Sequence, residues 1–291
     1  MAEVADIPPS ITVRDGANDA NGGDIRHEFD LYLRLVGALV RGQMQYRASF
    51  AMQMFGSFAG NALELVVLPF TFARFQNLAG WSLGEVLFLF ALASISFGLH
   101  EIVTAGFENI SELIRQGTFD RVLLRPVTPF TQMLAADFST RRFGRALTGV
   151  VALGIALTQT HVVWTWGKFL FFPITIASSV LLFAGITVLG ATLCFWTIER
   201  TEVINIFTYG GTYMASYPIS ILQNWLRQIV TFVIPLAFVA YYPGLYFLDR
   251  TDPFGVPPQV SFLAPVVSVV FFAFAWRVWE WGVRHYQSTG N

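Results

Sequence analysis

A chain with six long apolar runs has few folds open to it. A helix needs about 20 mostly apolar residues to cross the hydrocarbon core of a bilayer. The runs that meet this need lie at residues 48–71, 84–106, 143–161, 169–196, 204–221 and 261–282. Only 13% of the residues are charged, whereas a soluble domain has about 25%. The sequence therefore predicts an all-α integral membrane protein with six transmembrane helices, spread over a transmembrane domain at 48–284.

A seventh apolar stretch, residues 225–248, is broken by Pro235 and Pro243. As a full span it would give seven helices and place the two termini on opposite sides of the membrane. Polar residues around Gln223 and the two prolines instead favour a re-entrant hairpin at 223–248, between the fifth and sixth spans. Such backbone is tolerated at membrane depth only where protein or water satisfies its polar groups.

The N-terminal residues differ from the rest of the chain. Residues 1–25 combine four aspartates with Gly, Asn and Pro, so we expect a disordered tail. In residues 26–47 apolar residues recur every three or four positions, with arginines on other faces. This pattern predicts an amphipathic helix lying in the membrane interface; a helix packed on a protein neighbour is the alternative.

The arginines and lysine predict the topology. With the N-terminus inside, the inner side receives 14 of the 18 basic residues: Arg14, Arg26, Arg34, Arg41, Arg47, Arg115, Arg121, Arg125, Arg141, Arg142, Arg145, Arg200, Arg277 and Arg284. The outer side receives the other four: Arg74, Lys168, Arg227 and Arg250. Because cytoplasmic loops are enriched in Lys and Arg, we expect both termini in the cytoplasm, including the C-terminal residues 285–291. The predicted location is the cell inner membrane.

The longest inner loop, residues 107–142, has the densest charge pattern. Mixed charges at near-helical spacing alternate with apolar residues, Gly117 interrupts the run, and Pro126 and Pro129 end it. We expect one or two short amphipathic helices parallel to the membrane. A plain solvated connection is the alternative, but it would need far fewer residues.

Several chemistries are excluded or disfavoured. The phosphate-binding loop GxxxxGK[ST] needs a lysine, and Lys168 is followed by Phe169. The single cysteine, Cys194, excludes a disulfide framework and a multi-cysteine zinc site. The four histidines are scattered over different elements: His27, His100, His161 and His285. They form no cluster that a membrane-embedded enzyme would need. The net charge of −1 gives no sign of nucleic-acid binding.

Three segments resemble a known family. The run QGTFDRVLLRPVTP, Gln116–Pro129, is similar to the loop signature of ABC-2 type permeases. The ending WEWGVRHYQSTG, Trp279–Gly290, resembles the C-terminus of one branch of that family. The segment YPISILQNWLRQIVTFVIPLAF, Tyr217–Phe238, resembles the hairpin between its fifth and sixth spans.

The resemblance implies the permease subunit of an exporter that moves an amphipathic or lipid-like molecule outward. Such permeases pair with an identical or related permease and bind two cytoplasmic ABC ATPase subunits. ATP and Mg would be bound by those ATPases, with no cofactor in this chain. The loop after the second span acts as a coupling helix in this family. Carried onto this sequence, the ATPase contact falls on Glu112, Arg115, Gly117, Phe119, Asp120 and Arg121.

Polar groups inside the predicted spans are candidates for a translocation path or dimer seam. Acidic residues there are costly and usually face a cavity or a partner. The candidates are Asn61, Glu64, Glu101, Tyr209, Tyr213 and Tyr217. Hydrogen bonding inside the helix bundle explains the acidic residues equally well, and core packing explains the tyrosine stripe.

A second class of function remains open at this point. An ion-gradient-driven secondary transporter would use Glu64 or Glu101 as a titrating group. We find no inverted internal repeat of the kind that such proteins often show. Contacts with membrane lipid are expected in either class.

Overall fold

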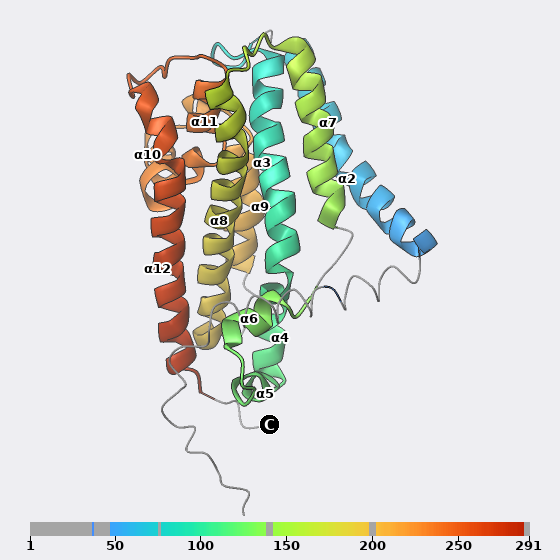
Figure 1. The fold of residues 1–291 in the computed structure, drawn as a ribbon, viewed down its shortest axis with the longest axis vertical. Coiled ribbons are helices and arrows are strands. Elements are labelled where there is room, and N and C mark those ends of the chain that lie inside the picture. Colours follow the sequence, from blue (N-terminus) through green and yellow to red (C-terminus); the bar gives the residue numbers. More distant parts are fainter. Residues whose placement is uncertain (1–36, 38–46, 75–76, 138–141, 198–201, 288–291) are drawn as a thin grey trace, which may run out of the picture.

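The computed structural model describes residue 37 and residues 47–74, 77–137, 142–197 and 202–287. The predicted tail at 1–25 and nearly all of the predicted interfacial helix at 26–47 lie outside these residues. The described part is helical (Figure 1). The long helices are α2 (Arg47–Arg74), α3 (Leu83–Thr104), α7 (Phe143–Gln159), α8 (Trp166–Thr197), α9 (Glu202–Ala215) and α12 (Ala264–Arg284).

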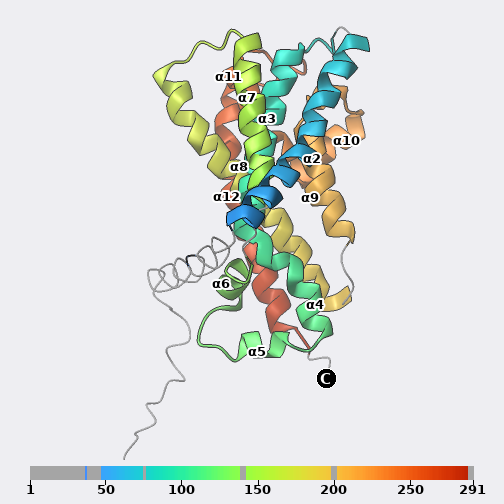
Figure 2. The same ribbon diagram turned by 90° about the vertical axis from the view of Figure 1, so that its right-hand side faces the viewer.

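Short helices gather at both ends of this bundle. A 3-10 turn, Ala105–Asn109, follows α3 and leads into α4 (Ile110–Arg115), α5 (Phe119–Leu123) and α6 (Pro129–Leu134). At the opposite end lie α10 (Asn224–Gln228), a π-helical turn at Ile229–Val233, and α11 (Tyr241–Phe247). A 3-10 turn at Pro258–Leu263 leads into α12. Figures 1 and 2 show α4, α5 and α6 at one end, which we call the α5 end, and α10 and α11 toward the other, which we call the α11 end.

Helix α3 is the centre of the bundle. It begins with a capping box, in which the Ser82 side chain accepts from the backbone N–H of Glu85 while the Glu85 carboxylate accepts from the N–H of Ser82. Most of its residues are buried, because α7, α8 and α9 surround it.

Glycines bring α3 and α7 into close contact. A Cβ added at Gly98 of α3 would lie 2.4 Å from the backbone nitrogen of Ala146. A Cβ at Gly149 of α7 would lie 2.6 Å from the nitrogen of Ile95. Small residues let membrane helices approach this closely. The backbones of α3 and α7 are therefore in direct contact at both glycines.

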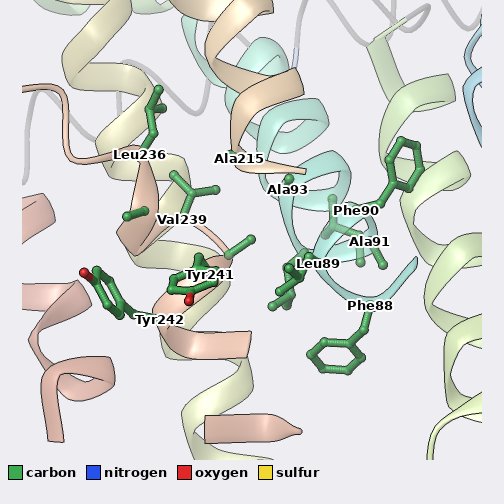
Figure 3. Close-up of a cluster of buried hydrophobic side chains, with 14 of the residues drawn as sticks. Phe88, Leu89, Phe90, Ala91, Ala93, Ala215, Leu236, Val239, Tyr241 and Tyr242 are labelled. Atoms are coloured by element: carbon green, nitrogen blue, oxygen red, sulfur yellow. The ribbon is translucent and has the colours of Figure 1, made fainter. Parts of the chain in front are cut away.

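The largest buried apolar cluster lies toward the α11 end. Figure 3 shows the Leu89 side chain of α3 pointing toward Tyr241 of the returning segment, which belongs to the same buried cluster. Trp81, which is fully buried, packs against Tyr241 with ring centroids 5.8 Å apart. The part of the returning segment from Leu236 to Phe247 is therefore packed into the protein core, whereas most residues from 224 to 234 remain at the surface.

The described part of the structure contains fewer full-length spans than the six that the sequence predicts. Within the described residues, four stretches are long and apolar enough to cross a membrane: Ala48–Arg74, Leu83–Arg115, Trp166–Thr197 and Pro258–Arg284. Asn224–Val233 and Leu236–Phe247 form a pair bent by 75°, as a broken span or a re-entrant loop. Helix α7 has 17 residues and α9 has 14. Each expected helix has a counterpart, but six complete spans remain a prediction.

Candidate functional site

The loop after α3 folds into the short helices that its pattern predicts. Helix α4 ends in a Schellman motif, in which the N–H of Thr118 donates to the carbonyl of Leu113 and the N–H of Gly117 donates to that of Ile114. Gly117 has a φ of +64°, which glycine adopts at no steric cost because it has no Cβ. Pro129 was expected to end a helix, but it occupies the first turn of α6 instead. We call residues 105–134 the coupling segment.

The apolar face of the coupling segment packs onto the ends of α8 and α12. Phe119 is fully buried, with its ring centroid 5.3 Å from Phe195 and 5.0 Å from Tyr286. On the other side, Phe130 lies 4.2 Å from Trp276. The segment is thus packed against two long helices. A displacement of the segment must therefore either shift these helices or break its contacts with them.

This packing buries one of the six residues that were expected to contact the ATPase. Phe119 cannot touch a partner directly, because no part of its side chain reaches the surface. Its position follows from its place on the apolar face of a short amphipathic helix. The other five expected residues lie at or near the surface: Glu112, Arg115, Gly117, Asp120 and Arg121.

The exposed face of the segment is charged. Arg115 pairs with Glu112 at 2.5 Å, and the Gln116 amide also donates to Glu112. Next to these charges, Leu124 is 85% exposed. Charged side chains beside two exposed leucines, Leu123 and Leu124, suit a surface that docks onto another protein.

The polar residues in the spans form two hydrogen-bonded pairs. The Tyr213 hydroxyl of α9 donates to Glu64 of α2 at 2.7 Å, and the Tyr209 hydroxyl donates to Glu101 of α3 at 3.1 Å. Both tyrosines keep more than a third of their surface exposed. Four of the six candidate residues thus meet on one face, which we call the α2–α9 polar face.

The other two candidates are not drawn into these pairs. The Asn61 amide donates to the carbonyl of Ser57 on its own helix, at 2.7 Å. Tyr217 is half-buried beside the apolar cluster. Their place in a path or a seam remains a prediction.

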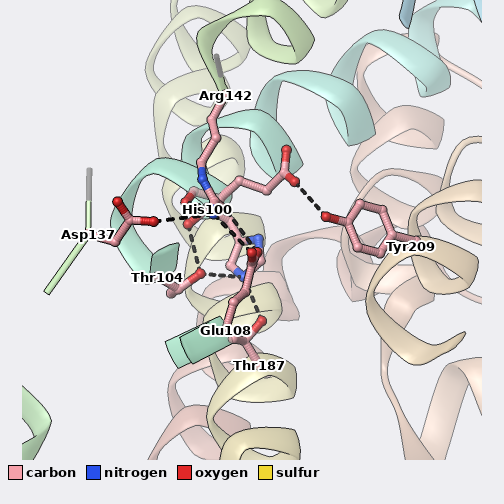
Figure 4. Close-up of polar contacts among 8 residues, drawn as sticks. His100, Thr104, Glu108, Asp137, Arg142, Thr187 and Tyr209 are labelled. Carbon is pink, nitrogen blue, oxygen red and sulfur yellow. Dashed lines mark hydrogen bonds and ion pairs between the residues drawn. The ribbon is translucent and has the colours of Figure 1, made fainter. Parts of the chain in front are cut away.

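Two arginines at the start of α7 complete the site, although no partner for them was expected from the sequence. Arg142 binds both oxygens of Glu108, at 2.7 and 2.9 Å (Figure 4). Arg145 lies 3.6 Å from Glu64. Burial alone would lower the pKa of Arg142, but the hydrogen bond and charge of Glu108 outweigh it and raise that pKa. Basic residues opening an apolar run were the available signal, since a buried charge needs a partner.

A histidine network lies beside Arg142. The Nε2 atom of His100 is 2.8 Å from the Thr187 hydroxyl and 2.9 Å from the Thr104 hydroxyl (Figure 4). These contacts tie α3 to α8 just before the coupling segment begins. They satisfy buried polar groups and favour a structural role for His100.

An apolar cavity of about 850 Å³ lies between α3, α7, α8 and α12. Its lining includes Leu99, Leu153, Ile176 and Phe272. No acidic or basic side chain lines it. It is separate from the α2–α9 polar face and has the character of a surface that contacts lipid.

Comparison with known proteins identifies the class. A family model described as "ABC-2 family transporter protein" matches residues 58–290. No curated protein and no solved structure matches the chain. The match covers most of the sequence and all long helices from within α2 onward. The chain therefore belongs to the ABC-2 transporter family.

Family membership agrees with the helical fold. The protein is a multi-pass membrane protein and a permease of the ABC type. Permeases of this family are transport subunits that are generally not catalytic themselves and normally work with ABC ATPase subunits.

Proposed function

We propose that the chain is the membrane subunit of an ABC-2 exporter that moves an amphipathic or lipid-like molecule outward, powered by ATP on separate subunits. The observation that carries this proposal is the coupling segment, within a chain of this family. Its apolar face is anchored on α8 and α12, and its charged face is exposed. Two cytoplasmic ABC ATPases would dock there and would bind ATP and Mg.

The contact with the ATPase is assigned to the exposed residues of the segment. Arg115 and Arg121 supply positive charge, while Glu112 and Asp120 supply negative charge close by. Gly117 sets the angle between α4 and α5. Phe119 serves as the anchor that transfers force to α8, because it is packed against Phe195.

The proposed path for the substrate follows the α2–α9 polar face. Aromatic rings and carboxylates alternate there, which suits a molecule with both apolar and polar parts. Large apolar side chains on α2 are exposed, including Phe55 at 70% and Phe70 at 73%. Membrane lipid or a second permease, identical or related, would cover such a surface.

We place the protein in the cell inner membrane, with its α5 end on the cytoplasmic side. Arg115, Arg121 and Arg125 lie at the α5 end, whereas Lys168 and Arg250 lie at the other. The distribution agrees with the enrichment of basic residues in cytoplasmic loops. A secondary transporter is the less favoured alternative, because the family is one of ABC permeases.

The test is reconstitution with ABC ATPase subunits from the same genome. We expect the chain alone to hydrolyse no ATP and the complex in nanodiscs to hydrolyse it.

Reversing two exposed charges, Arg115→Glu with Arg121→Glu, should abolish assembly while leaving Phe119 and the fold in place. Arg277→Glu, an exposed arginine of α12, is the matched control. Full assembly of the double variant would overturn the contact assignment. Transport of a fluorescent phospholipid by the chain alone in ATP-free vesicles would overturn the proposal itself.

A further inference from the structure

Two arginines are buried at the start of α7, Arg142 as its N-cap residue and Arg145 in its first turn. Arg142 is 8% exposed and Arg145 is 7% exposed. They are three residues apart, so their side chains leave the helix on nearly the same side. A buried guanidinium is tolerated only where anions and carbonyls satisfy it. The partners of these two arginines therefore define what the start of α7 is fastened to.

Arg142 fastens α7 to the coupling segment. Its two terminal nitrogens bind the two oxygens of Glu108, and one of them also donates to the carbonyl of Glu101 at 3.3 Å. Glu108 lies in the 3-10 turn that begins the coupling segment. A bidentate arginine–carboxylate pair fixes orientation as well as distance, so this turn and α7 are held at a set angle (Figure 4).

The same turn is also fixed to the rest of the coupling segment. A Cβ added at Gly106 would lie 1.9 Å from the carbonyl oxygen of Met133 in α6. The turn and α6 are thus in backbone contact. A displacement of α6 reaches Glu108 directly.

Arg145 fastens the same helix to the α2–α9 polar face. Its Nη2 atom is 3.6 Å from the Glu64 carboxylate of α2. The guanidinium lies over the ring of Phe97 in α3 at 4.7 Å and faces the ring of Tyr213 in α9 at 6.0 Å. One side chain therefore contacts three helices, and Tyr213 and Glu64 are also bonded to each other.

We propose that Arg142 and Arg145 form a transmission node that carries movement of the coupling segment through the first turn of α7 to the α2–α9 polar face. Both are positioning residues, and this inference rests on the proposed function, in which that segment is moved by an ATPase. A single stiff helical turn joins the two sets of contacts. Two independent anchors with no mechanical link are the competing explanation.

A double-mutant cycle separates these explanations. Glu108 and Glu64 bind different arginines, so independent anchors predict additive effects of Glu108→Gln and Glu64→Gln. A node predicts non-additivity of at least about threefold in amide-exchange protection of α2 and α9. The measurement uses the full chain in phospholipid nanodiscs. Arg277→Gln, an exposed arginine of α12, is the control and should change neither region.

The single variants also have distinct expected results. Glu108→Gln should increase amide exchange in the coupling segment and also around Glu64 and Tyr213. Exchange changes confined to residues 105–115, or an additive cycle, would overturn the node. Should Glu108→Gln not fold, Arg142→Lys serves instead, because it keeps the charge but loses the bidentate geometry. The swap Glu108→Arg with Arg142→Glu should restore much of the protection that Glu108→Gln loses.

A second measurement uses the complex with the ATPases. We expect Glu108→Gln to lower transport of a fluorescent phospholipid by about 2- to 30-fold relative to ATP hydrolysis. Unchanged transport per ATP would count against the node. If no ATPase assembles, the proposed function fails, but the exchange cycle still decides whether the node exists. An additive cycle in an active complex removes the node and leaves the proposed function intact.

Discussion

The hydroxyl of Tyr213 on α9 donates a 2.7 Å hydrogen bond to Glu64 on α2, across 149 residues of sequence. Helices α2 and α9 share few other described contacts. Each helix is placed mainly by other neighbours, α2 by α7 and α9 by α8 and α3, and this bond together with Arg145, which lies beside both residues, links the two directly. A bond of this kind on a half-exposed face can break and re-form during a transport cycle.

Removing the Tyr213 hydroxyl should have a small and specific cost. We expect Tyr213→Phe to lower the free energy of unfolding by about 1 kcal/mol, because the hydroxyl that is lost donates to a charged acceptor, Glu64, in a pair that is partly exposed. Thermal unfolding in detergent should show a decrease of about 2 to 4 °C. Tyr217→Phe is the control, since the Tyr217 hydroxyl makes no hydrogen bond within the described residues. Equal shifts in both variants would contradict this account.

The close approach of α3 and α7 gives a second prediction. Gly98→Ala should lower the free energy of unfolding by about 1 to 3 kcal/mol, because the new methyl group would overlap the backbone of Ala146. Gly154→Ala on α7 should be neutral or stabilising, by up to about 1 kcal/mol, since a Cβ there meets nothing within 4 Å. Thermal unfolding of both variants in the same detergent measures the difference. A tolerated Gly98→Ala would show that the two helices can separate at little cost.

Lys168 provides a test of buried charge. It is 3% exposed and donates to Asp249 at 2.6 Å and to the carbonyl of Phe247 at 2.9 Å. Asp249→Asn should cost more stability than Lys168→Met, by about 1 to 3 kcal/mol, because it leaves the ammonium buried without its anion. Asparagine tolerates the positive φ of 51° at residue 249. Greater stability of Asp249→Asn than of Lys168→Met would contradict the ranking.

Glu85 has two roles that can be separated. It completes the capping box of α3 and also binds Arg250 at 2.7 Å, while Arg250 lies over the Trp81 ring at 4.4 Å. Glu85→Gln retains an acceptor for the cap but loses the charge, so we expect a loss of less than about 1 kcal/mol. Glu85→Ala loses both and should cost about 1 to 2 kcal/mol more. Equal unfolding temperatures for the two variants would mean that the cap contributes nothing.

Much of the helix layout could be predicted from apolar run lengths. The expected run at 169–196 became α8, and the prolines at 235 and 243 marked the bent segment. Short helices were also expected in the loop that became the coupling segment, with Gly117 as the break. Run length depends on local composition, which a single sequence contains.

The pairings could not be predicted in the same way. Glu101 meets Tyr209 across 108 residues and Glu108 meets Arg142 across 34. Helical periodicity tells which face a residue occupies but not which helix comes to that face. Phe119 shows what periodicity can give, because its apolar position indicated the burial that is observed, while its expected role at the ATPase contact stays a prediction.

The ring of Tyr286 lies 5.0 Å from Phe119, edge to face, although its residue follows the end of α12. The last described residues therefore form part of the surface on which α5 packs. An affinity tag or a protease cut placed shortly after Arg284 would disturb the contact between Tyr286 and Phe119. A transport assay would then show less transport per ATP hydrolysed, as if coupling to the ATPase were lost. Tags for this protein belong elsewhere on the chain.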